Sequence, residues 1–153
     1  MSRRSRSINE SASLVQGTIV VLDLDKFEEL TKKFGLDPYK PNFITGELTE
    51  LIERLARNYG GVVIYGLDPE RGTEEALLEF PFVKPRELLP ALEEIREAIS
   101  RLGASISIVA IEGMVSCAVA RTRRELVSTP WRALAYKELR ALKRRGGGRV
   151  LVT

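Results

Sequence analysis

Two aspartates, Asp23 and Asp25, stand two positions apart at the end of an apolar run that begins at Gly17. If this run is a strand that continues through them, their side chains leave it on the same side. Two carboxylates at a strand end can bind Mg²⁺ or Mn²⁺ together with a backbone carbonyl oxygen and bound phosphates. The alternative for Asp25 is a cap on the helix that follows, a common role at a strand–helix junction.

A second acidic group flanks a predicted hairpin further along the chain. Asp68 and Glu70 follow one predicted strand, and Glu74 and Glu75 begin the next. If this hairpin pairs beside the first strand, one of its ends faces Asp23. The two groups would then form a two-metal site, which supports in-line phosphoryl transfer without a histidine. The alternative is an ordinary solvated acidic loop.

The composition limits the chemistry that these residues can perform. The 153 residues contain no histidine and a single cysteine, Cys117. Catalysis by Ser-His-Asp or Cys-His groups and histidine-ligated zinc or iron are therefore excluded, as is an internal disulfide. The lone cysteine, with no signal peptide and no apolar run of membrane-spanning length, predicts a cytoplasmic protein. One glutamine among many glutamates and arginines predicts a heat-adapted one.

The chain divides into a predicted flexible basic tail, residues 1–16, and one domain, residues 17–153. Of the 24 lysines and arginines that oppose 21 acidic residues, Arg3, Arg4 and Arg6 lie in this tail. Such a tail can contact nucleic acid phosphates. A solubilising role is the simpler interpretation, so nucleic acid stays a minor alternative as partner.

Hydrophobic periodicity and turn residues predict the elements that position these side chains. Strands are expected at 17–23, 62–67, 76–80, 105–111, 114–120 and 149–152, with Glu112-Gly113 as the turn between the fourth and fifth. Helices are expected at 27–34, from a Thr45 cap to Tyr59, from the Pro85–Pro90 segment to Leu102, and from a Thr129 cap to Gly146. This order predicts the α+β class, with a ferredoxin-like (palm-like) antiparallel sheet and helices packed on one face.

Several segments together resemble one family. D-L-D-K-F at 23–27 and the aromatic–glycine pair at 34–35 match a D-x-D-x-F opening. Residues 71–78 resemble a degenerate GG(D/E)EF hairpin, and residues 94–99 resemble a helix with the sequence E-R-I-R-E-A-I. Residues 115–120 resemble a V-S-I-G-V-A strand, and residues 135–150 resemble a C-terminal pattern A-D-K-A-L … A-K … G-R/N-V. In this order the segments resemble GGDEF domains, the diguanylate cyclases related to class III nucleotidyl cyclases. Residues 41–65 are similar to archaeal GTP cyclohydrolase III, a more distant relative.

The resemblance implies a site. Asp23, the carbonyl of Leu24 and the pair Glu74-Glu75 would hold two Mg²⁺ or Mn²⁺ ions, with Asp23, Glu74 and Glu75 as catalytic residues. Y-G-L-D at 65–68 also resembles half of the hairpin motif, so Asp68 is an alternative ligand. The nucleotide contacts implied are Phe27, Thr31, Glu47, Gly72, Lys137 and Lys143.

Departures from the family pattern keep three functions open. Thr31 and Glu47 stand where the family reads guanine with asparagine and aspartate, and Thr73 and Ala76 replace a motif glycine and phenylalanine. The first function is metal-dependent binding of a purine nucleoside triphosphate, GTP or ATP, with phosphoryl or nucleotidyl transfer by a homodimer. The alternatives are an inactive nucleotide-binding or protein-interaction module of the same fold, or a GTP cyclohydrolase III-like enzyme.

Overall fold

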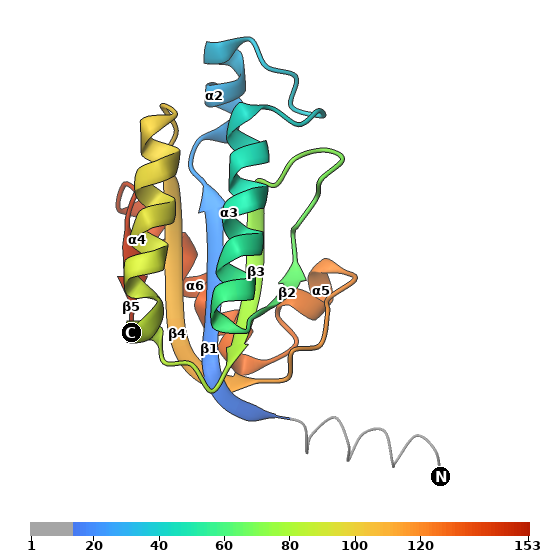
Figure 1. The fold of residues 1–153 in the computed structure, drawn as a ribbon, viewed down its shortest axis with the longest axis vertical. Helices are drawn as coiled ribbons and strands as arrows, with labels where there is room; N and C mark the ends of the chain where they lie inside the picture. Colours follow the sequence, from blue (N-terminus) through green and yellow to red (C-terminus); the bar gives the residue numbers. More distant parts are fainter. Residues whose placement is uncertain (1–13) are drawn as a thin grey trace.

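The computed structural model describes residues 14–153, which form one five-stranded sheet with helices (Figure 1). The predicted α+β class and palm-like arrangement are confirmed. In chain order the elements are β1 (Val15–Leu24), α2 (Phe27–Phe34), α3 (Phe43–Tyr59), β2 (Val62–Tyr65), β3 (Glu75–Pro81), α4 (Pro85–Arg101), β4 (Ile106–Val115), α5 (Arg123–Leu126), α6 (Pro130–Arg144) and β5 (Val150–Val152).

The sheet has the strand order β2-β3-β1-β4-β5, so the first strand of the chain lies at its centre. β1 pairs antiparallel with both β3 and β4, and β2 pairs antiparallel with β3. β5 runs parallel to β4, which makes the sheet mixed and departs from the predicted antiparallel arrangement at this edge alone.

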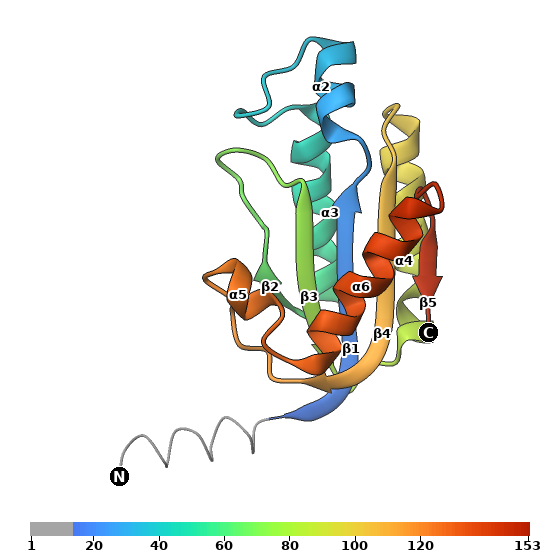
Figure 2. The ribbon, with the colours of Figure 1, turned by 180° about the vertical axis from the view of Figure 1, so that it is seen from behind.

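Helices cover both faces of the sheet, whereas the sequence analysis placed them on one. α3 and α4 lie on the face seen in Figure 1, and α6 lies on the opposite face, seen in Figure 2. β1 supplies Val20 and Leu22 to the core beneath α3 and α4, and Ile19 and Val21 to the core beneath α6. Burial on both faces explains why the apolar run of β1 shows no polar alternation.

Several local predictions were wrong, among them the strand at 114–120, because β4 ends at Val115 and residues 116–120 form no strand. β4 is one continuous strand through the expected turn at Glu112-Gly113, because Gly113 leaves room for the Trp131 ring: a Cβ there would lie 2.4 Å from Trp131 Cδ1. α3 begins earlier than expected, capped by Asn42, whose side chain accepts hydrogen bonds from the amides of Ile44 and Thr45. The short helix α5 was not predicted.

The predicted basic tail lies outside the described residues as far as residue 13, while Val15 and Gln16 belong to β1. Within residues 14–153, no helix combines the length and the apolar character needed to cross a membrane.

Candidate functional site

Asp23 lies near the end of the central strand, between two residues of the neighbouring strands. Its cross-strand partners are Glu75 on β3 and Ser107 on β4. Directly opposed residues of antiparallel strands project from the same face, so the two carboxylates lie side by side. Burial raises the pKa of both carboxyl groups; the charge of Asp25 adds to this effect at Asp23, and the charge of Asp23 adds to it at Glu75.

A lysine from the helix on this face meets the first aspartate. Lys143 Nζ on α6 donates to Asp23 Oδ2 at 2.7 Å and to the Leu24 carbonyl oxygen at 3.2 Å. This hydrogen bond and the charge of the ammonium lower the pKa of Asp23, but burial outweighs them. Lys143 is a nucleotide contact in the site that the resemblance implies, and in the structure its ammonium lies on the carboxylate and carbonyl that were expected to hold a metal ion.

The carboxylate of the second aspartate, Asp25, is held by hydrogen bonds within the protein. Asp25 accepts hydrogen bonds from Ser105 Oγ at 2.6 Å, Ser107 Oγ at 2.7 Å and the Gly148 amide at 2.9 Å. It does not cap α2, whose N-cap is Lys26 without a side-chain hydrogen bond. Asp25 therefore ties the end of β1 to the start of β4 and to the glycine segment 146–148 that leads into β5.

The other predicted acidic ligands surround Asp23 without joining it in one cluster. The Glu74 carbonyl accepts the Leu24 amide at 2.9 Å, extending the pairing of β1 with β3 by one residue. Burial raises the pKa of Glu74, and the nearby Asp23, Glu75 and Asp68 add to this effect, while Arg71 opposes it. Asp68 Oδ1 accepts the amides of Glu70 and Arg71, at 3.1 and 2.9 Å, and so shapes the turn of the hairpin connection.

The fit of a divalent ion can be judged from these donors. Asp23 and the Leu24 carbonyl supply the oxygen atoms that Mg²⁺ prefers. An ion bound there would have to displace the Lys143 ammonium from both atoms. In the part of the chain that the structure describes, no three acidic or cysteine side chains are arranged to hold a metal. Asp23, the neighbouring Glu75 and the Leu24 carbonyl would therefore fit the predicted ion only with the Lys143 ammonium displaced.

Two residues to which sequence reasoning gave no role complete this region. Arg123 on α5 lies 3.4 Å from Glu75 Oε1, and the Tyr136 hydroxyl on α6 is buried without a hydrogen-bond partner. Burial, followed by the charge of Glu75 and the proximity of Tyr65, raises the pKa of Tyr136. Nothing in the sequence indicates these contacts, because strands and helices distant in sequence bring the residues together.

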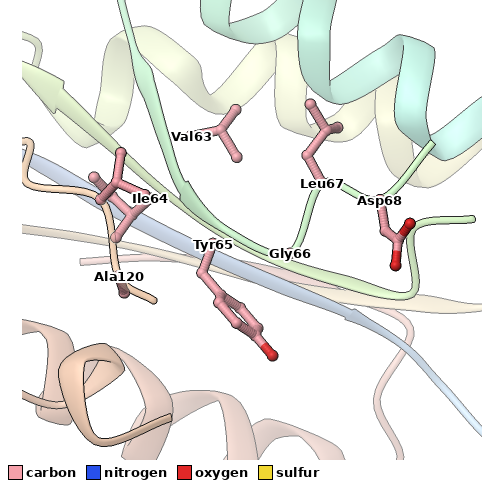
Figure 3. Close-up of a pocket in the computed structure, with 8 residues that line it drawn as sticks. Val63, Ile64, Tyr65, Gly66, Leu67, Asp68 and Ala120 are labelled. Atoms are coloured by element: carbon pink, nitrogen blue, oxygen red, sulfur yellow. The ribbon is translucent and has the colours of Figure 1, made fainter. Parts of the chain in front are cut away.

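A cavity of about 440 Å³ adjoins the region along the outer edge of β2. Tyr65 connects the cavity with the Asp23 region. It lines the cavity, and its side chain points away from Val63 and Leu67, toward the helices on the α6 face of the sheet (Figure 3). The volume falls in the range of small-molecule sites. The lining consists of residues 63–68 with Val119 and Ala120.

The remaining predicted nucleotide contacts are dispersed. The Thr31 hydroxyl is buried and donates to the Glu28 carbonyl within α2, and Phe27 packs against the core beneath α3 and α4. Gly72 is buried against α3, where a Cβ would lie 2.2 Å from Thr45 Oγ1. Glu47 is partly exposed on α3, and Lys137 is exposed on α6, six residues before Lys143.

No family model matches the chain, and no curated protein matches it. The GGDEF domain of FimX from Pseudomonas aeruginosa is 15% identical, with a TM-score of 0.56 over 98% of this chain and 93% of that one. A microbial GGDEF domain solved with cyclic di-GMP is 18% identical, with a TM-score of 0.49 over 99% and 87%. This chain has a GGDEF-like fold over nearly its whole length.

Proposed function

We propose that this chain is a nucleotide-binding GGDEF-like module that does not transfer phosphoryl groups through a divalent ion at Asp23. The position of Lys143 carries the proposal. Its ammonium neutralises Asp23 and occupies the Leu24 carbonyl, so the two donors expected to organise the metal are already engaged. An ammonium supplies one positive charge where a divalent ion would supply two, and it cannot bridge phosphate oxygens to the carboxylate.

The GGDEF-like fold and the charge around the site support nucleotide binding. Arg123 and Lys137 are exposed cations on α5 and α6, the helices that cover the Asp23 face of the sheet. Phosphates attract such cations. The cavity beside Tyr65 has the volume of a small-molecule site and offers a place for the base. In this proposal the ligand is a purine nucleotide whose phosphates contact cationic side chains directly.

The first experiment separates binding from turnover. The protein is incubated with GTP or ATP and Mg²⁺ or Mn²⁺, and the nucleotides are identified by mass spectrometry; we expect them unchanged. Isothermal titration with the same nucleotides should show binding that survives EDTA and weakens in Arg123→Ala and Lys137→Ala. Arg57→Ala, which removes an exposed arginine from α3, is the matched control. A product that disappears in Asp23→Ala would overturn the proposal in favour of metal-dependent transfer.

Lys143→Met tests the metal question directly. Removing the ammonium leaves the Asp23 carboxylate and the Leu24 carbonyl without their partner. We expect a loss of about 1–2 kcal/mol in the free energy of unfolding, because a hydrogen bond to a charged group is lost in a partly exposed site. Millimolar Mg²⁺ should raise the melting temperature of this variant and leave that of the unmodified protein unchanged.

Lys137→Met is the control for this experiment, since it removes an exposed lysine from the same helix. It should change neither the stability nor the response to Mg²⁺. Stabilisation of the unmodified protein by Mg²⁺ to the same extent as the Lys143→Met variant would show that the ammonium does not exclude the ion.

A further inference from the structure

Three aromatic rings are exposed on the connection between α2 and α3, at the top of the molecule in Figure 1. Phe34, Tyr39 and Phe43, here called the aromatic patch, expose 39%, 70% and 49% of their surface. Aromatic side chains are large apolar groups that usually contribute to a core or an interface. Their gathering at one end of the molecule, outside both cores, marks a binding surface.

The surrounding structure holds these rings in place. The Phe34 and Phe43 rings meet edge to face with their centroids 5.7 Å apart, and Gly103 lies beneath Phe34, where a Cβ would be 3.2 Å from Cζ. The Tyr39 amide donates to Asp37 Oδ1 at 2.9 Å, which fixes the turn that carries this ring. The rings are therefore held by local contacts while 39% to 70% of each residue stays exposed.

Cations accompany the rings. Lys33 Nζ lies 5.6 Å from the centroid of Phe34, and the Arg71 guanidinium, from the hairpin connection, lies 5.3 Å from the centroid of Tyr39. Lys32 and Lys40 are also exposed, and Asp37 is the single acidic residue between positions 32 and 43. The surface thus combines flat apolar faces with a surplus of positive charge.

We propose that the aromatic patch binds single-stranded nucleic acid. Unpaired bases offer flat faces that stack on such rings, and the phosphates between them complement Lys32, Lys33, Lys40 and Arg71. A duplex hides its bases from stacking, and an acidic peptide satisfies the cations but leaves the rings without flat partners. Lys32, Lys33 and Lys40 lie in the same short stretch of chain as the three rings, and binding to a strand without sequence preference uses this combination of cations and stacking rings.

The proposal is tested by fluorescence anisotropy with the full chain and a labelled oligouridine. A length of about 12 nucleotides lies within the usual site size of proteins that bind single strands. Tyr39→Ala should weaken binding about tenfold, which corresponds to the loss of one stacked base. Tyr39→Trp should retain binding because the flat ring remains. Phe82→Ala is the matched control: Phe82 is 78% exposed on the connection between β3 and α4, where its amide bonds to Gln16 at the start of β1. This variant should bind as the unmodified protein does.

Two further measurements test the contribution of phosphate contacts and of the basic tail. Lys40→Ala should make the dependence of log K on log salt shallower, by about 0.7 for one lost phosphate contact on a single strand. Serine replacements of Arg3, Arg4 and Arg6 in the full chain should leave the effect of Tyr39→Ala intact. Binding abolished by these replacements and unaffected by Tyr39→Ala would assign nucleic acid to the tail and overturn the proposal. Equal affinity for a duplex of the same length, or no binding to either, would also overturn it.

Discussion

Burial raises the pKa of three neighbouring carboxyl groups, Asp23, Glu74 and Glu75. A raised pKa in the folded protein means that folding favours the protonated acid. The stability that proton uptake provides is present below the ordinary pKa, 4.5 for a glutamate, and is lost as the pH rises through the higher folded value. At neutral pH the ionised group therefore opposes folding.

Glu75→Gln should consequently stabilise the protein at pH 7. We expect a gain of about 1 kcal/mol that shrinks as the pH falls through the raised folded pKa and is gone below 4.5, since glutamine removes the buried charge and keeps the shape. The lost contact with Arg123 offsets little of this, because that arginine is mostly exposed. Urea unfolding at several pH values measures the effect, and Glu53→Gln on the surface of α3 controls for the change in net charge. A Glu75→Gln variant less stable than the unmodified protein at pH 7 would contradict this account.

Sequence motifs pointed to Asp23 and Lys143 but not to the contact between them. Asp23 and Lys143 both belong to segments that resemble the family, yet 120 positions separate them, and nothing in the spacing shows that they contact each other. Asp25 presents the same difficulty, because its partners Ser105, Ser107 and Gly148 come from β4 and from the connection before β5. Only the assembled sheet brings these atoms within hydrogen-bond distance.

Among the elements, the hairpin connection between β2 and β3 is fixed by its packing against α3. Thr73 is fully buried, its hydroxyl lies 2.7 Å from that of Thr49, and it accepts the Asp68 amide at 3.1 Å. Gly72 packs beside Thr45 with a φ of +91°, a conformation that favours glycine. The connection is thereby held down on the N-terminal half of the helix.

Gly72→Ala should destabilise the protein by about 2 kcal/mol, because the new Cβ both meets Thr45 and forces a left-handed backbone on alanine. Gly46→Ala is the matched control. Gly46 lies in the interior of α3 with no atom within 4 Å of an added Cβ, so this change should stabilise by up to about 1 kcal/mol through helix propensity. Denaturant unfolding of both variants measures the contrast, and similar effects of the two changes would rule out close packing at Gly72.

Glycine also explains where prediction of the elements succeeded and where it failed. Gly35 and Gly60 end α2 and α3 as expected, because both adopt the left-handed conformation that closes a helix. Gly113 has a different function: it makes room for Trp131 inside a continuous strand. A sequence shows that a position lacks a side chain, but not whether the backbone turns there or another element packs against it.

Across the whole molecule, a buried ion pair joins the sheet to the helical face. Arg132 on α6 and Glu79 on β3 are 2% and 0% exposed, with nitrogen–oxygen distances of 2.9 and 3.0 Å in a bidentate arrangement. The arginine also donates to the carbonyls of Ala118 and Glu125, and Glu79 accepts the Cys117 amide. The pair thus fastens the long connection between β4 and α6, which contains α5 and Arg123.

Arg132→Met should cost about 3–5 kcal/mol, because it leaves the Glu79 charge buried without a partner. Adding Glu79→Met should recover much of the lost stability, since two apolar side chains leave no unpaired charge in the core. Arg96→Met, which breaks an exposed pair with Glu93 on α4, should cost less than about 1 kcal/mol. Chemical unfolding of the unmodified protein and of these three variants measures the differences in the free energy of unfolding. A double variant as unstable as Arg132→Met would instead assign the loss to the hydrogen bonds with residues 116–129.

The central position of β1 also affects the chain during its synthesis. β1 ends at Leu24, while its two neighbours in the sheet begin only at Glu75 and Ile106. A ribosome therefore releases the apolar run Ile19–Leu22 well before either strand exists to pair with it. Unpaired apolar strands are prone to aggregate. α2 and α3 emerge next and can cover one face of the run, whereas the other face stays open until α6 is made, so translation is the stage at which this chain most needs a chaperone.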